Sequence, residues 1–203
     1  DFEYVNDDGE RVTRTNSDYD TRNVTGKLYY HPSESSEIMA EGGYVTSEYG
    51  MPWATEIYRQ RYWRFSDWDR YLFNVGGTFP LADRGFMKAR GYYVKHHNVL
   101  DAYASEDLTE LQWKSTFDNY SYGASLSGSV LAGQRNEIKF SAHAKSDQAR
   151  TQDDVGEEWE RFSQRTLSVG AEEHFRLDER WALMAGVSAD RLDKEEGNDK
   201  TAL

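Results

Sequence analysis

Apolar and polar side chains alternate with a period of two along most of this chain, and this alternation restricts its fold more than any other feature. From residue 122 to 130, the even positions read Tyr, Ala, Leu, Gly and Val, and the odd positions hold only Gly and Ser. Similar segments begin at Val24, Ile38, Tyr71, Met87, Ile138, Leu167 and Trp181. Because successive side chains of a strand point to opposite faces, the pattern predicts an all-β chain.

The connections between these segments alternate between short and long. Tight turns are expected at 32–36, 81–85, 132–136 and 177–180, and longer polar stretches lie at 50–61, 101–112 and 153–160. One strand with its share of loop takes about 24 residues, whereas immunoglobulin-like sandwiches place turns every ~8–12 residues. Outer-membrane barrels have short turns on one rim and long loops on the other. The spacing therefore predicts an antiparallel transmembrane β-barrel.

Among the alternate, apolar positions of these strands, aromatic residues occur at two heights, one near the tight turns and one nearer the long loops. Tyr30, Phe79, Phe175 and Trp181 lie near tight turns, and Tyr44, Tyr71, Tyr93 and Tyr122 lie nearer the long loops. Tyr71 and Phe79 would be ~26 Å apart at ~3.3 Å per residue, and strand tilt shortens this to the thickness of the apolar band. Two aromatic belts are typical of a wall that faces lipid. A soluble β core could also hold aromatics, but it would not need two levels.

Composition excludes several classes of function. The net charge of −12 leaves no basic stripe for nucleic acid. The absence of cysteine excludes disulfides and thiol catalysis. No nucleophile, base and acid stand in a recognisable catalytic order, and there is no phosphate loop, so we expect neither an enzyme nor a cofactor. His96 and His97 are adjacent on a predicted strand and point to opposite faces, so no metal site is expected there.

The number of strands predicts that residues 1–203 are one part of a larger barrel. Residues 1–5 also alternate and are expected to be the outer end of a preceding strand. Together with the eight segments above, this gives nine predicted strands. Nine antiparallel strands cannot close as an even-numbered barrel. The polar tail after residue 193 also lacks the terminal aromatic residue expected of an outer-membrane protein. We therefore expect about eight to nine strands of a larger barrel.

Several stretches resemble the barrel of TonB-dependent outer-membrane receptors. They read NVTGKLYYHPSESSEI, RYWRFSDWDRYLFNVGGTFPLADRGFMKARGYYVKHHNVLDAY, DNYSYGASLSGSV and RTLSVGAEEHFRLDERWALMAGVSADR. The resemblance implies the outer membrane of a Gram-negative bacterium and a barrel of about 22 strands, plugged by an N-terminal domain. It also implies uptake, energised by TonB, of a scarce nutrient such as a ferric siderophore. The plug domain and the TonB-contacting segment have no counterpart here.

One loop combines aromatic and arginine side chains that could bind an anionic or aromatic ligand by stacking and charge-assisted hydrogen bonds. The candidate ligand-binding residues are Trp53, Tyr58, Arg59, Arg61, Trp63 and Trp113. The same residues could instead anchor a structured loop at the membrane interface. Acidic runs such as 153–158 are expected to be solvated, or to reach lipopolysaccharide through divalent cations.

The side chains at the alternate, polar positions of the strands are expected to face a barrel interior and its plug. They include Lys27, Glu41, Lys88, Arg90 and Lys139. Two other hypotheses remain open: a soluble extracellular β-rich binding module or adhesin, and an outer-membrane enzyme of barrel type. A soluble, monodisperse protein in plain buffer would favour the binding module.

Spin labels at Leu126 and Ser127 test the alternation directly. In a bilayer, we expect the label at Leu126 to be accessible to oxygen and the label at Ser127 to a polar relaxation reagent, because neighbours on a strand face opposite sides. Equal accessibility at both positions would contradict the barrel hypothesis.

Overall fold

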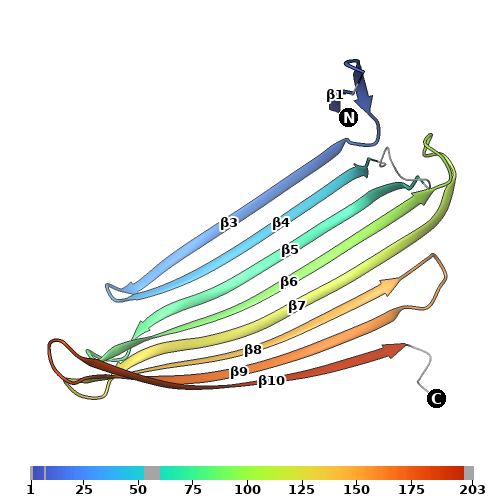
Figure 1. Cartoon of the computed structure of the whole chain (residues 1–203). Coiled ribbons are helices and arrows are strands. Elements are labelled where there is room, and N and C mark those ends of the chain that lie inside the picture. The colour runs from blue at the N-terminus through green and yellow to red at the C-terminus, as the bar shows by residue number, and fades with distance from the viewer. Residues whose placement is uncertain (1, 7, 53–59, 199–203) are drawn as a thin grey trace.

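The computed structural model describes residues 2–6, 8–52 and 60–198, and within them the chain forms ten β-strands and no helix. Eight strands make one antiparallel sheet in chain order (Figure 1). They are β3 (Tyr19–Ser33), β4 (Ser36–Met51), β5 (Tyr62–Pro80), β6 (Gly85–Tyr103), β7 (Leu111–Leu131), β8 (Asn136–Gln152), β9 (Glu160–Arg176) and β10 (Ala182–Asn198). Within the described residues, no helix of the length and apolarity needed to cross a membrane is found.

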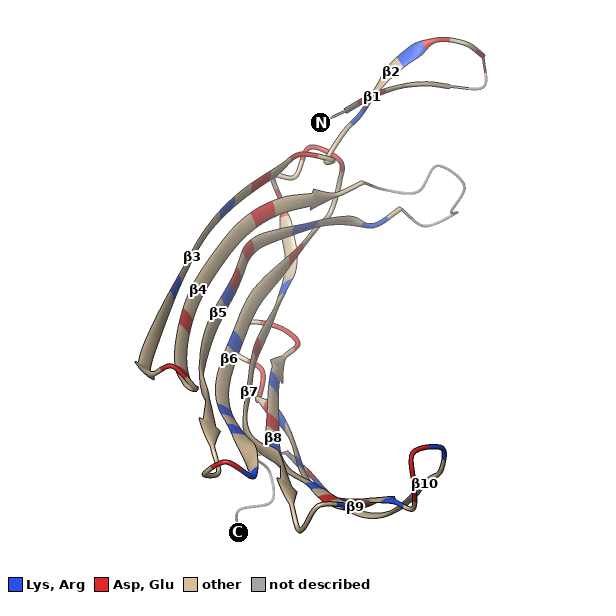
Figure 2. Cartoon of the chain, turned by 90° about the vertical axis from the view of Figure 1, so that its left-hand side faces the viewer, with Lys and Arg blue, Asp and Glu red and all other residues tan. Residues whose placement is uncertain are grey.

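The all-β antiparallel fold predicted from the alternation is confirmed. The strands of the large sheet are long, between 15 residues in β3 and 21 in β7, whereas most strands in globular proteins have ~5–6. Short turns join β3 to β4, β5 to β6, β7 to β8 and β9 to β10 at one end, and longer connections lie at the other end. The sheet curls into an arc but does not close (Figure 2), so β3 and β10 each have one neighbour within it.

The prediction of a ninth arm in the wall at residues 1–5 is wrong. β1 (Phe2–Val5) pairs with β2 (Arg11–Arg14) in a separate two-stranded sheet. A tight turn holds this hairpin, because the Asn6 side chain accepts hydrogen bonds from the backbone N–H groups of Asp8 and Glu10. Gly9 follows with a φ of 80°, which glycine adopts without a steric penalty. Local turn chemistry therefore turns this segment away from the large sheet.

The large sheet is a single layer without a hydrophobic core. Among the described residues, Ala102 is the one buried hydrophobic side chain. One face of the sheet, here called the apolar face, carries the side chains from the alternate, apolar positions of every strand. These side chains are uncovered: Leu28 is 69% exposed, Phe73 52% and Val187 74%. Contiguous apolar surface on this scale needs a cover that water does not provide.

The opposite face, here called the polar face, carries the predicted polar residues. Lys27 Nζ lies 3.0 Å from Glu41 Oε1. Asn74 donates a 3.1 Å hydrogen bond to Glu41 and accepts one of 3.2 Å from Arg90. These contacts form a polar ladder across β3, β4, β5 and β6, and Asn74 is buried at its centre.

Replacing Asn74 with alanine should destabilise the sheet by about 1–2 kcal/mol, because Glu41 and Arg90 each lose a hydrogen-bond partner. Urea denaturation in detergent micelles measures this change. Thr78→Ala, on the same face of β5, is the matched control and should have a smaller effect. Equal destabilisation by the two variants would show that the ladder contributes nothing specific.

Candidate functional site at the long-loop end of the sheet

Three of the six candidate ligand-binding residues lie in the described part of the chain, and they gather at one place. Trp53, Tyr58 and Arg59 lie outside the described residues. The rings of Trp63 and Trp113 meet edge to face, with centroids 5.6 Å apart. Arg61 places its Cζ 4.8 Å from the centroid of the Trp63 ring. The structure therefore brings together two tryptophans and an arginine from β5, β7 and the segment before β5.

Strand register explains why the two tryptophans meet. Trp63 on β5 pairs with Ala102 on β6, and Ala102 pairs with Trp113 on β7. Ala102 is 1% exposed because the two large rings cover its methyl group from both sides. A small residue between two large ones lets side chains two strands apart touch.

A β-bulge decides on which face this cluster lies. Phe65 pairs with Leu100 and Asp67 with Val99, so Ser66 is an extra residue in β5. Trp63 shares odd parity with Tyr71, and an unbroken strand would place both on the apolar face. The bulge reverses the parity beyond it and puts Trp63 on the polar face. A bulge of this kind leaves no clear mark in the sequence.

Further aromatic side chains lie near the cluster, and the sequence analysis did not single them out as site residues. The rings of Tyr49 and Phe65 lie 4.8 Å apart, as do those of Trp68 and His96. By register, all of them lie on the polar face towards the long loops. We call Tyr49, Trp63, Phe65, Trp68 and Trp113 the aromatic strip. Phe65, like Trp63, lies beyond the bulge at Ser66, so it shares the polar face although its number is odd like that of Tyr71.

Asn16 fastens the start of β5, which carries Trp63. Its Nδ2 donates hydrogen bonds to the carbonyl oxygens of Met51 at 2.9 Å and Trp63 at 2.7 Å. Asn16 is 5% exposed and has a φ of 56°, a conformation that asparagine tolerates better than most residues. Gly50 packs so closely that an added Cβ would lie 2.2 Å from Asn16 Oδ1. The segment before β3 is thereby tied to the end of β4 and the start of β5.

Asp18 and Arg64 form an ion pair beside Asn16. Arg64 Nη1 donates a 2.9 Å hydrogen bond to Asp18 Oδ1, and Nη2 reaches the second carboxylate oxygen. This bidentate contact is the main cause that lowers the pKa of Asp18 from its ordinary value of 3.8, against a smaller opposing effect of burial. The ion pair therefore exists over the whole neutral range.

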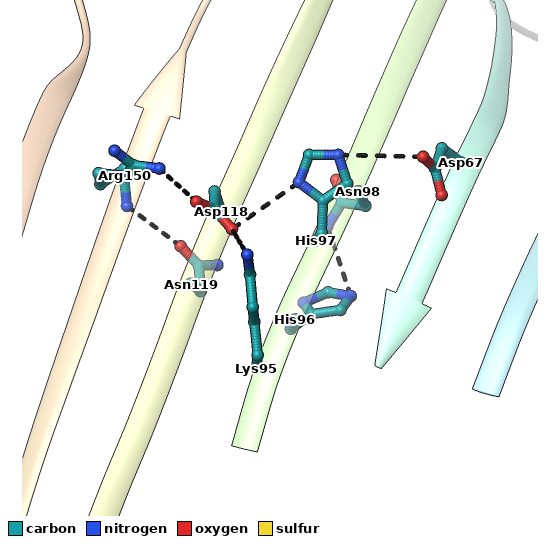
Figure 3. Close-up of polar contacts among 8 residues, drawn as sticks. All are labelled: Asp67, Lys95, His96, His97, Asn98, Asp118, Asn119 and Arg150. Carbon is teal, nitrogen blue, oxygen red and sulfur yellow. Dashed lines mark hydrogen bonds and ion pairs between the residues drawn. The ribbon is translucent and has the colours of Figure 1, made fainter. Parts of the chain in front are cut away.

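A second polar cluster lies on the apolar face, beyond the tyrosines nearer the long loops (Figure 3). Asp118 is its centre: Lys95 Nζ lies 3.2 Å from Oδ1, Arg150 contacts Oδ2, and His97 Nδ1 is 3.8 Å from Oδ1. His97 Nε2 is 3.9 Å from Asp67. We call these five residues the Asp118 cluster.

The two adjacent histidines have separate surroundings, as the alternation predicts. His97 belongs to the Asp118 cluster, whereas the ring of His96 packs against Trp68 of the aromatic strip. Across the described ranges, no group of three or more His, Asp or Glu side chains is placed to hold a metal ion.

Comparison with known proteins supports the fold. No protein-family model matches the sequence, and no curated protein is significantly similar to it. A solved structure, the copper transporter OprC, superposes with a TM-score of 0.72 at 15% sequence identity. The match covers 96% of this chain and 32% of OprC, so the chain spans about a third of that protein. The eight-stranded sheet thus resembles part of an outer-membrane barrel.

The Asp18–Arg64 ion pair should make the free energy of unfolding depend on pH in the acidic range. Because the pKa of Asp18 is lower in the folded than in the unfolded chain, its contribution is complete above the unfolded value of about 3.8 and is lost as pH falls through the folded pKa. Urea midpoints of the wild type and Asp18→Asn should differ at pH 5–7, and the difference should shrink as pH falls below 3.8 and through the folded pKa. A difference that stays constant over this range would contradict the assignment.

Proposed function

We propose that this chain forms part of the wall of a TonB-dependent outer-membrane receptor, which imports a scarce nutrient such as a ferric siderophore. The exposed apolar face carries this proposal. In a barrel wall that face meets lipid tails, and the polar face meets the interior. The proposal assigns no catalytic step and no cofactor to the chain. The plug domain and TonB would contact it as partners from outside residues 1–203.

The aromatic residues of the apolar face support a membrane location. Tyr71, Tyr93 and Tyr122 are 44%, 40% and 46% exposed near the long loops, and Trp181 is 69% exposed beside a tight turn. Between these levels the face carries aliphatic side chains such as Leu126 and Val169, which are also exposed. Amphipathic rings on both sides of an aliphatic band match the two interfaces of a bilayer.

The sheet edges support a larger barrel. The N–H and C=O groups on the outer edges of β3 and β10 have no strand partner within the described residues. In hydrocarbon, each unsatisfied backbone group costs several kcal/mol, so transmembrane sheets close on themselves. Further strands that pair with β3 and β10 would complete the wall. The match to about a third of an outer-membrane transporter agrees with this arrangement.

The aromatic strip supports a bulky ligand with flat or anionic groups. It lies on the polar face towards the long loops, which is the external mouth in a barrel of this type. The Trp63 and Trp113 rings offer stacking surfaces, and Arg61 attracts anionic groups and repels a bare cation. A ferric siderophore, which is a large anionic chelate, has these properties.

The soluble binding module fits the structure less well. A soluble β protein of this length buries its apolar face against a second layer. Within the residues that the structure describes, the sheet has no second layer, and its apolar side chains remain uncovered. A lipid environment supplies the cover that this alternative lacks.

Ligand binding to the reconstituted protein tests the proposal. Proteoliposomes are titrated with a ferric tricatecholate siderophore, and tryptophan fluorescence is recorded. Trp63→Ala should weaken binding by about tenfold, which corresponds to ~1.4 kcal/mol. Trp181→Ala, at the opposite end of the sheet, should leave the affinity unchanged.

Two outcomes would contradict the proposal. A chain that is monodisperse in buffer without detergent and does not enter bilayers would refute the membrane wall. Binding that Trp63→Ala and Trp181→Ala weaken equally would refute a ligand site at the aromatic strip.

A further inference from the structure

The polar face contains a hollow between β6 and β10, on the tight-turn side of the aromatic strip. Its volume is about 440 Å³, which is within the range of pockets that hold small ligands. Two neighbouring rows of the strand register form its walls, one from His96 to Phe162 and the next from Val94 to Lys194. The side chains of both rows lie on the polar face, so the hollow opens on the same side as the polar ladder.

Small side chains in the middle of these rows leave the surface recessed. Ser121 on β7 and Ala149 on β8 line the hollow, and the larger Phe162 stands beside Ala149 on β9. Among the described residues, Ser121 Oγ is buried without a hydrogen-bond partner. A buried hydroxyl group in this state is unfavourable, and a polar ligand group in the hollow would satisfy it.

Two amide side chains of the hollow are available to a ligand. Asn119 Oδ1 accepts a 3.3 Å hydrogen bond from the backbone N–H of Arg150 (Figure 3), which leaves its Nδ2 as a donor. Gln164 has no hydrogen-bond partner among the described residues. The two amides stand on strands two apart, a spacing of ~10 Å. One sugar ring with hydroxyl groups on opposite edges can bridge this spacing.

The hollow is electrically neutral and contains an exposed ring. Among its described side chains on the polar face, Asp147 and Lys194 carry opposite charges, which gives 1 − 1 = 0. Asp147 also has an ion pair with Lys145 at 2.9 Å. Phe162 is 41% exposed and offers a flat apolar surface. Neutral donors and acceptors around an aromatic ring suit a saccharide, which has hydroxyl groups on its edge and C–H groups on its face.

The hollow adjoins the aromatic strip. His96 lines the hollow, and its ring lies 4.8 Å from the ring of Trp68, which belongs to the strip. From β5, which carries Trp68, to β9, which carries Phe162, there are four strand spacings, or ~19 Å. A bulky ligand can therefore contact both places at once, with a flat anionic part on the strip and a neutral part in the hollow.

We propose that the hollow binds a saccharide group carried by the ligand. The inference rests on the proposed function and names its ligand class more closely, as a glycosylated siderophore. Hydroxyl groups of the sugar accept hydrogen bonds from Asn119 Nδ2 and Lys194 and donate to Asp147. One of them also becomes the partner of Ser121 Oγ. The C–H face of the sugar ring covers Phe162.

A matched pair of ligands tests the assignment. The reconstituted protein is titrated by calorimetry with a ferric tricatecholate siderophore, and then with the same siderophore carrying glucose on its catechol rings. The glucosylated form should bind about tenfold more tightly, because only its sugar reaches the hollow. Equal affinity for the two forms, or weaker binding of the glucosylated form, would overturn the proposal.

Variants of the hollow locate the gain in affinity. Gln164→Ala removes an amide and Ala149→Leu fills the recess, so each should abolish the preference for the glucosylated form. Both should bind the unglucosylated form as the wild type does, which shows that they are folded. Ser168→Ala on β9 and Ser141→Leu on β8, on the same face outside the hollow, are the matched controls and should retain the preference. A preference that persists in both hollow variants would overturn the site.

A free oligosaccharide separates this inference from the proposed function. If neither siderophore binds, the siderophore assignment fails, whereas binding of maltoheptaose that Gln164→Ala abolishes would still support the saccharide site. Binding of both siderophores with equal affinity would overturn the saccharide site alone. Absence of any binding that depends on Gln164, for all three ligands, would also overturn it.

Discussion

Backbone hydrogen bonding between long neighbouring strands is the interaction on which the rest of this structure depends. Seven antiparallel pairings join β3 to β10, each over most of the length of its strands. The described residues form no second layer and almost no buried apolar core, so side-chain packing cannot replace this pairing. In a lipid environment the pairing gains importance, because no water is present to satisfy a broken backbone bond.

The pairing also sorts the side chains into two faces with different chemistry. Register places small, aliphatic and aromatic residues on one face and a hydrogen-bonded polar ladder on the other. Each candidate site uses this separation. The aromatic strip and the hollow between β6 and β10 belong to the polar face, where a ligand in the interior would meet them. The Asp118 cluster belongs to the apolar face.

Features that are set by consecutive residues could be predicted from the sequence, whereas features that depend on contacts between distant segments could not. The four tight turns were predictable because alternation stops there and turn-forming residues replace it. The hairpin at β1 and β2 was missed, because a short alternating segment does not reveal its partner, and the Asn6–Gly9 turn selects a local one. The clustering of Trp63 with Trp113 depends on register and on the small size of Ala102, so the sequence offered both residues as candidates but could not show that they touch.

The sequence alone determined the strand class, the positions of most turns and the face of most side chains, because a period of two is a property of consecutive residues. Only the tertiary structure decided the face of Trp63 and Phe65, since one extra residue at Ser66 reverses parity and its effect appears only against the partner strands. It also decided which distant side chains meet. The polar ladder, the Asn16 contacts and the hollow between β6 and β10 each join three or more segments. Their formation depends on register between strands, which no single segment encodes.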